Sequence, residues 1–266
     1  MKRNIKLLSI DLDGTLLTSA GTVDEESLKL LWKCKEYGMT IVFNTARPIK
    51  IIPKEIYRIF SDDYWIFSNG TTCMKGCEMI FHINMHKPSA DKLIRIVHHE
   101  YPSFFFSMES QGDIYTSRSR SHMCQKYFAN SIHLEELVAK PTNKILIISE
   151  ERNFPIQKIR SSVGPDTREL ITDSGKYIQF MPRCVSKLSA IEHILELLNI
   201  HIGEVLAFGD DSNDLELIKA SGIGVAMGNA NMQVKRYADY VTTSNDDKGV
   251  MLFLEHLLSE KELLIY

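Results

Sequence analysis

An apolar run from Ile5 to Ile10 is followed at once by two aspartates, Asp11 and Asp13. A continuous apolar run of this length is typical of a strand that is buried on both faces of a parallel sheet. The two aspartates then lie at the carboxyl end of the strand, where open α/β sheets bind ligands. Two carboxylates at one place repel each other, so the pair indicates a bound hard cation or a proton held for acid catalysis. The alternative is a polar turn without further function.

The same order of apolar run and polar turn recurs twice in the next sixty residues. The segment Thr22-Val23-Asp24-Glu25 predicts a capping box for a helix that ends near Gly38. A second strand, Met39 to Phe43, ends in Asn44-Thr45-Ala46-Arg47-Pro48, and a third, Tyr64 to Phe67, ends in Ser68-Asn69-Gly70. Strands that alternate with helices predict an α/β fold with a Rossmann-like, doubly wound parallel sheet.

The pattern changes after residue 84, where hairpin signals are interspersed with short helices. The segment Glu109-Ser110-Gln111-Gly112 lies between two extended runs, and Asp173-Ser174-Gly175 between two more. From Ser186 the helix and strand alternation resumes. The sequence therefore predicts a core of residues 1–84 and 182–266, with an inserted α+β domain of residues 85–181.

A second carboxylate cluster follows the apolar run Val205 to Phe208. Its sequence is Gly209-Asp210-Asp211-Ser212-Asn213-Asp214. Acidic residues at a helix start are ordinary dipole partners, which alone accounts for Asp214. Three aspartates exceed what capping needs. If this strand neighbours the first, Asp11, Asp13 and Asp210 converge on an oxygen-lined site that suits Mg²⁺.

Composition limits the classes of partner. The chain has 266 residues, of which 44% are hydrophobic, with a formal net charge of −3, so it is a globular protein without an electrostatic footprint for nucleic acid. No apolar segment reaches the length of a membrane span, so no membrane partner is expected. Five scattered cysteines favour reduced thiols, and with them a cytoplasmic location.

Four motifs in order resemble those of the haloacid dehalogenase-like superfamily of phosphatases. They are Asp11-Leu12-Asp13-Gly14-Thr15, Thr45 before Arg47, Lys187, and Gly209-Asp210 with Asp214. The insertion between the second and third motifs, together with Ser68-Asn69-Gly70 and Val185-Ser186-Lys187, resembles the Cof-like sugar phosphatases of that superfamily. The resemblance implies a phosphatase with an α/β cap.

The resemblance also implies roles for residues. Asp11 is the expected nucleophile, which forms an aspartyl phosphate, and Asp13 the expected general acid and base. Mg²⁺ is the expected cofactor. The phosphate is expected to be bound by two backbone amides, those of Leu12 and Ala46, and by three side chains, those of Thr45, Lys187 and Asn213. The metal ligands are Asp11, Asp13 through its backbone carbonyl, Asp210 and, in support, Asp214.

Three positions depart from the family pattern. Ala46, Cys184 and Leu188 stand where glycines are common, so the local backbone around the phosphate pocket is open to question. The catalytic groups are all retained.

Within the inserted domain, Arg118 and Arg120 are candidates for contacts with a charged group of the substrate. A small phosphorylated metabolite, in particular a sugar phosphate, is the expected substrate. A phosphomutase that returns the phosphoryl group to the sugar is one alternative, and a sensor that only binds phosphorylated metabolites is another. The sequence leaves the identity of the metabolite and the oligomeric state open.

Overall fold

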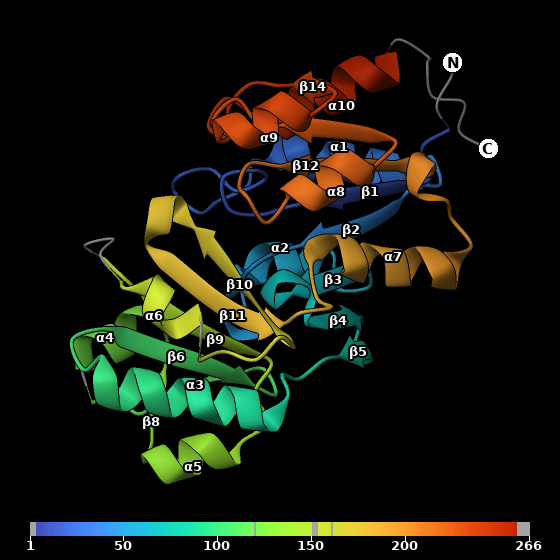
Figure 1. Cartoon of the computed structure of the whole chain (residues 1–266). Helices are drawn as coiled ribbons and strands as arrows, with labels where there is room; N and C mark the ends of the chain where they lie inside the picture. Colours follow the sequence, from blue (N-terminus) through green and yellow to red (C-terminus); the bar gives the residue numbers. More distant parts are fainter. Residues whose placement is uncertain (1–3, 120, 151–153, 161, 260–266) are drawn as a thin grey trace. The chain divides into compact units, whose positions relative to one another are not determined.

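The computed structural model describes residues 4–119, 121–150, 154–160 and 162–259. Contacts between Cα atoms divide the chain into two compact units, both drawn in Figure 1. The first unit, here called the core, comprises the chain up to Ala46, the segment Pro53–Ile80, and the chain from Ser186 onward. The second, here called the inserted unit, comprises Arg47–Ile52 and Phe81–Val185.

An eight-stranded sheet in the order β14-β13-β12-β1-β2-β3-β4-β5 forms the centre of the core. The pairs from β14 to β3 are parallel, and β4 pairs antiparallel with β3. The sheet is therefore mixed, because the short connection after β3 can only bring the chain back antiparallel. The strands are β1 (Leu7–Ile10), β2 (Thr40–Asn44), β3 (Tyr64–Phe67), β4 (Thr72–Lys75), β5 (Glu78–His82), β12 (Val205–Gly209), β13 (Ile223–Ala226) and β14 (Tyr240–Val241).

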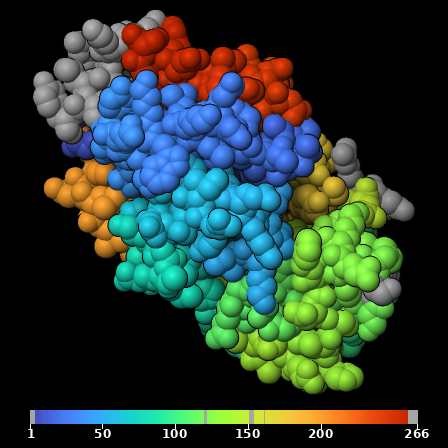
Figure 2. All heavy atoms as spheres, turned by 180° about the vertical axis from the view of Figure 1, so that it is seen from behind, coloured from blue at the N-terminus to red at the C-terminus, as the bar shows by residue number. Residues whose placement is uncertain are grey.

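Helices cover both faces of this sheet. The chain runs from β1 through β2 to β3 in one direction and from β12 through β13 to β14 in the other, so right-handed crossovers place the helices of the two halves on opposite faces. Figure 2 shows α10 (red) beside α1 (blue) on one face, and α8, which Figure 1 shows on the other face, contacts α7 and α9. The helices are α1 (Glu25–Glu36), α2 (Lys54–Ile59), α7 (Lys187–Leu198), α8 (Leu215–Ala220), α9 (Met232–Tyr237) and α10 (Gly249–Ser259), with 3₁₀ turns η2 (Ser68–Gly70) and η4 (Ile202–Glu204).

The strand order reverses direction between β12 and β1, and this point fixes the location of the site. Ile10 pairs with Phe208 on one side and with Phe43 on the other, and all three side chains are buried. The residues that follow these strands therefore emerge side by side at one edge. Ligands of doubly wound sheets bind at such a reversal point.

The inserted unit has a sheet of its own, in the order β10-β11-β9-β6-β7-β8. One face of it packs against α3 through buried side chains such as Leu93, Phe106 and Ile145. The α/β fold with an inserted second sheet confirms the predicted fold class. The strands are β6 (Phe105–Ser110), β7 (Asp113–Thr116), β8 (Asn130–Ser131), β9 (Lys144–Ile148), β10 (Thr167–Thr172) and β11 (Tyr177–Pro182); the helices are α3 (Lys87–Glu100), α4 (Ser121–Lys126), α5 (Leu134–Ala139) and α6 (Ile156–Arg160), with 3₁₀ turns η1 (Ile49–Ile51) and η3 (Asp173–Gly175).

In the described part of the chain, no helix combines the length and the apolar character that crossing a membrane requires.

Asp24 gives a direct test of how α1 is held. Its carboxylate accepts hydrogen bonds from the backbone N–H of Ser27 at 2.9 Å and from the Ser27 hydroxyl at 2.7 Å, and it lies 3.7 Å from the Lys248 ammonium. We expect Asp24→Ala to lower the free energy of unfolding by about 1 kcal/mol in urea titrations. Asp24→Asn, which keeps the cap, should lose clearly less.

The pKa of Asp24 gives the sign of the pH effect. Burial raises this pKa, but the Ser27 hydrogen bonds and Lys248 outweigh burial, so the pKa lies below its ordinary value of 3.8. The contribution of Asp24 is therefore present at neutral pH and is lost as the pH falls below about 4. Equal unfolding free energies of Asp24→Ala and wild type at pH 7 would contradict this assignment.

Candidate active site

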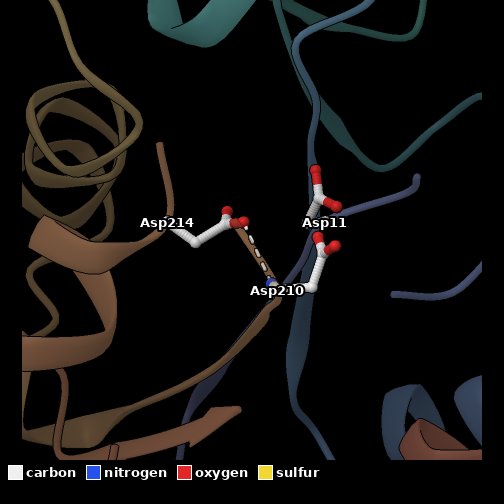
Figure 3. A group of neighbouring side chains, drawn as sticks. All are labelled: Asp11, Asp210 and Asp214. Atoms are coloured by element: carbon white, nitrogen blue, oxygen red, sulfur yellow. Dashed lines mark hydrogen bonds between the residues drawn. The ribbon is translucent and has the colours of Figure 1, made fainter. Parts of the chain in front are cut away.

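Three aspartates from two neighbouring strand ends form a cluster in the core. Asp11 directly follows β1, Asp210 directly follows β12, and Asp214 precedes α8. Each offers an oxygen atom, and these atoms all lie within 4.8 Å of one another. Figure 3 shows the Asp11 and Asp210 carboxylates facing each other, with Asp214 reaching toward them from the start of α8. Within the described residues this is the one group of three or more potential metal-ligating side chains.

The turn after β1 brings this part of the chain close to Asp210. The carbonyl oxygen of Leu12 accepts hydrogen bonds from Thr15 at 3.2 Å and Leu17 at 2.8 Å, and Gly14 lies in the left-handed region with φ 74°. A Cβ atom at Gly14 would lie 2.3 Å from Oδ2 of Asp210. Glycine is therefore required here for its conformation and for its lack of a side chain. The Thr15 hydroxyl donates to Asp210 at 3.4 Å.

Lys187 joins two of the three carboxylates. Its fully buried ammonium lies 2.5 Å from Oδ1 of Asp11 and 2.6 Å from Oδ1 of Asp214. The Ser186 capping box starts α7 at Lys187, and the Asn44 amide donates to the Lys187 carbonyl at 3.1 Å. A cation in the first turn opposes the helix dipole. The two carboxylates explain why lysine is nevertheless found there.

Asp214 also shapes the loop that carries Asp210. Its second oxygen, Oδ2, accepts hydrogen bonds from the backbone N–H of Asp210 at 3.2 Å, the dashed line in Figure 3, and from that of Asp211 at 3.3 Å. Gly209 permits this contact, because a Cβ atom there would lie 2.4 Å from the Asp214 side chain. One carboxylate thus fixes both the loop and Lys187.

The electrostatics of the cluster favour a bound cation. Burial raises the pKa of Asp11 from 3.8 to about 7, with Lys187 lowering it in part and Asp214 raising it. Burial, together with Asp11 and Asp214, raises the pKa of Asp210 to about 9. Burial lowers the pKa of Lys187, but the two carboxylates outweigh that effect and raise it overall. One lysine cannot neutralise three carboxylates, and such a set of oxygens fits a hard divalent cation.

The other predicted site residues of the core lie at the same strand ends. Thr45 is fully buried, its backbone N–H donates to Ile66 at 2.9 Å, and its carbonyl accepts from Asn69 at 3.0 Å. Asn213 donates from its amide to Oδ1 of Asn69 at 3.0 Å. Ala46 is half-buried, and the Leu12 side chain is fully buried in the core.

Asp13 differs from Asp11 in its surroundings. Its side chain is exposed, whereas that of Asp11 is buried, and Asp13 forms an isolated bridge with Leu17. The cluster of side-chain oxygens is made by Asp11, Asp210 and Asp214, so Asp13 does not add a carboxylate to it. The two aspartates of the first motif therefore differ in burial.

The structure gives Arg118 a local role in the inserted unit. Its Nη2 atom donates to the carbonyl oxygens of Val97 and His98, both at 2.9 Å, and to that of Tyr101 at 3.3 Å. These carbonyls end α3, so the guanidinium caps that helix. A contact between Arg118 and a substrate stays a prediction. Arg120 lies outside the described residues.

Two residues that the sequence places at strand ends without a role, Asn44 and Asn69, belong to the site. Asn44 holds the Lys187 backbone, and Asn69 bonds both Thr45 and Asn213. Their position at strand ends was a usable signal, but their partners are far away in the sequence. Among the departures from the family pattern, Leu188 does not disturb the start of α7, since Lys187 still reaches both carboxylates.

The chain is similar to known proteins over almost its whole length. A family model for haloacid dehalogenase-like hydrolases matches residues 8–254. A 5-amino-6-(5-phospho-D-ribitylamino)uracil phosphatase of Bacillus subtilis is 26% identical over 95% of this chain and 97% of its own. A phosphoglycolate phosphatase of Methanothermobacter thermautotrophicus is 25% identical over 92% of this chain and 96% of its own.

Solved structures agree in fold. A haloacid dehalogenase-like hydrolase from Bacteroides thetaiotaomicron superposes with a TM-score of 0.83 at 25% identity, covering 96% of this chain and 100% of the other. A sugar phosphatase of subclass IIB of the superfamily superposes with a TM-score of 0.82 at 23% identity, covering 95% and 98%. The second similarity extends to the inserted sheet as well as the core.

Gly14→Ala tests the close approach between the first motif and Asp210. We expect at least a tenfold weaker binding of a divalent cation by calorimetry, because the new methyl group displaces the Asp210 carboxylate. Gly21→Ala is the matched control, since Gly21 has a φ of 76° and nothing within 4 Å of a Cβ atom. Equal losses in both variants would assign the effect to backbone strain instead.

The raised pKa values predict how stability depends on pH. The ordinary pKa of an aspartate is 3.8, whereas the pKa is about 7 for Asp11 and about 9 for Asp210 in the native protein. At pH values between these limits, and without a divalent cation, the native protein therefore binds more protons than the unfolded chain. Its stability should therefore fall as the pH rises from 5 to 8. Magnesium chloride should raise the melting temperature more at pH 8 than at pH 5. Asp210→Asn should show a smaller pH slope and a smaller effect of the salt, and an unchanged slope would refute the assignment.

Proposed function

The chain belongs to the haloacid dehalogenase-like hydrolases, and we propose that it is a Mg²⁺-dependent phosphatase of small phosphorylated metabolites with Asp11 as its nucleophile. The observation that carries this proposal is the cluster of Asp11, Asp210 and Asp214 around the buried Lys187 ammonium. An anion-binding protein without catalysis would gain nothing from three carboxylates beside its ligand. A hydrolase needs an oxygen nucleophile and a way to bring it to an anionic substrate.

In this proposal Asp11 attacks phosphorus. Its carboxylate would form a bond to the phosphorus atom as the bond to the leaving oxygen breaks, which gives an aspartyl phosphate. Asp13, the exposed carboxyl of the same turn, would donate its proton to the leaving alkoxide. Water would then attack phosphorus, Asp13 would take up the proton of that water, and inorganic phosphate would leave with Asp11 restored.

Lys187 supports this chemistry by its charge. Its raised pKa keeps it protonated, so it holds Asp11 in position and favours the ionised form of that carboxylate. The same ammonium can bind a phosphoryl oxygen once the substrate arrives. Charge that is fixed in place before the reaction costs no reorganisation during it, and a single such donor contributes about 10²- to 10³-fold in rate.

The donor set fits Mg²⁺. Asp11 and Asp210 would hold the ion with the carbonyl oxygen of Asp13, and Asp214 would support it by orienting the Asp210 loop. When bound, Mg²⁺ supplies positive charge that lets an anionic nucleophile approach an anionic phosphate. The pKa values of Asp11 and Asp210 are raised when no cation is bound. A bound cation would lower these pKa values and keep both carboxylates ionised.

Phosphate binding would use groups at three strand ends. We propose the Thr45 hydroxyl, the backbone amides of Leu12 and Ala46, and the Asn213 amide. We propose that residues 85–181, which lie within the inserted unit, are a cap domain that would provide contacts with the leaving group. Two relatives act on a phosphorylated ribitylaminouracil and on phosphoglycolate, and a structural neighbour is a sugar phosphatase. A small phosphorylated metabolite, with sugar phosphates first, is therefore the proposed substrate class.

Phosphate release from a panel of sugar phosphates, nucleotides and phosphoglycolate tests the proposal. We expect release in Mg²⁺ that EDTA abolishes, and a loss of about 10³-fold or more in Asp11→Asn, because an amide cannot form the acyl phosphate. Asp62→Asn makes the same change at an exposed position and should retain full activity. Activity of the folded Asp11→Asn protein at the wild-type level would refute the nucleophile.

A further inference from the structure

Three consecutive residues after β3 adopt the left-handed conformation. Ser68, Asn69 and Gly70 have φ values of 54°, 58° and 105°. Only glycine adopts this region without strain, and the similar run Asp173-Ser174-Gly175 differs in that none of its residues is buried. All three residues are buried. A strained and buried backbone persists only where surrounding contacts hold it, so the contacts of this loop are informative.

The loop reaches three separate motifs of the core. The backbone N–H of Asn69 donates to the Thr45 carbonyl at 3.0 Å. Gly70 packs so closely on α7 that a Cβ atom there would lie 2.3 Å from the carbonyl oxygen of Ser186, the residue before Lys187. The Asn69 side chain accepts a hydrogen bond from the Asn213 amide at 3.0 Å.

Asn69 is not explained by its backbone alone. Glycine would meet a φ of 58° at lower cost, as it does at the next position. Asparagine tolerates the left-handed region better than most residues, and it brings an amide oxygen that glycine lacks. That oxygen receives one N–H of Asn213, whereas Oδ1 of Asn213 is buried and has no hydrogen-bond partner in the part of the chain that the structure describes.

We propose that Asn69 is a positioning residue that fixes the orientation of the Asn213 amide. An amide group has two N–H donors and one acceptor, and its two ends are exchanged by a rotation of 180°. Because Asn69 presents an acceptor, it selects the orientation in which the Asn213 nitrogen faces the loop. The second N–H and the buried Oδ1 of Asn213 are then held in fixed directions, in which they can bind the substrate and the attacking water. The inference rests on the proposed function in that it takes Asn213 as a phosphate ligand.

A double-mutant cycle tests the coupling between these two residues. We expect Asn69→Gly and Asn213→Ala each to lower kcat/KM for phosphate release by about 10- to 100-fold, since small misplacements at a reacting site have effects of this size. The double variant should lose no more than about threefold beyond the worse single variant, because both changes remove the same interaction. The proposal would be overturned if the loss in the double variant equalled the product of the two single losses, or if Asn69→Gly had wild-type activity.

Asn199→Gly is the matched control. Asn199 ends α7 in the same left-handed conformation, with φ 53°, and is exposed. It receives the same change in backbone freedom far along the helix from Lys187, and it should keep the wild-type kcat/KM. If Asn69→Gly is poorly folded, Asn69→Asp replaces it, because aspartate retains the acceptor oxygen. A folded Asn69→Asp protein should keep more activity than Asn213→Ala, and an equal loss would count against the proposal.

A spectroscopic readout separates this proposal from the proposed function. In protein labelled with ¹⁵N-asparagine, the NH₂ signals of Asn213, identified by their loss in Asn213→Ala, should be protected from exchange in wild type and in Asn199→Gly. Asn69→Gly should lose that protection, and retained protection would overturn the proposal even if the enzyme is a phosphatase. Protection lost as expected, in a protein that releases no phosphate from any compound, would leave Asn69 as a positioning residue and refute the proposed function.

Discussion

The contact between the Lys187 ammonium and the carboxylates of Asp11 and Asp214 is the interaction on which the site depends. Burying three charges costs several kcal/mol for each ion unless they are paired and hydrogen-bonded. Here one ammonium bonds both carboxylates, at 2.5 and 2.6 Å, and it comes from a helix whose start is fixed by a capping box. The first, third and fourth motifs are thereby joined into one unit around a single cation.

The cluster is built for charge rather than for stability. Asp210 adds a third carboxylate that Lys187 does not reach at bonding distance, and burial raises its pKa to about 9. A protein selected for stability alone would replace such a group with an apolar one. The excess of negative charge is accounted for if a divalent cation and a phosphate bind together, because the cation then has partners on both sides.

The glycine and asparagine residues around the cluster set the positions of the backbone at the strand ends. Gly14 and Gly70 stand where a Cβ atom would collide with another motif, so these motifs meet at van der Waals distance, and Gly209 stands where it would collide with Asp214 of its own motif. Asn44 and Asn69 then fix the strand ends by hydrogen bonds to neighbouring backbone and side chains. The inserted unit has its own sheet and buried core. Arg118 caps α3 there, which shows that a guanidinium in a polar segment can serve the local fold.

The strand ends, and the carboxylates that follow them, could be predicted from the amino-acid sequence. The apolar runs that end at Asp11 and Asp210 predict buried parallel strands, because such strands bury every residue. The change of pattern after residue 84 marks the inserted sheet. The sequence did not determine which atoms meet. The role of Lys187 came from a resemblance. Its contact with Asp214 joins residues 27 positions apart in the sequence. The helix cap made by Arg118 spans 17 to 21 positions, and the hydrogen bond between Asn69 and Asn213 spans 144. Such contacts depend on the order of strands in the sheet and on the exact approach of backbones, which local propensity does not encode. They are seen in the folded structure alone.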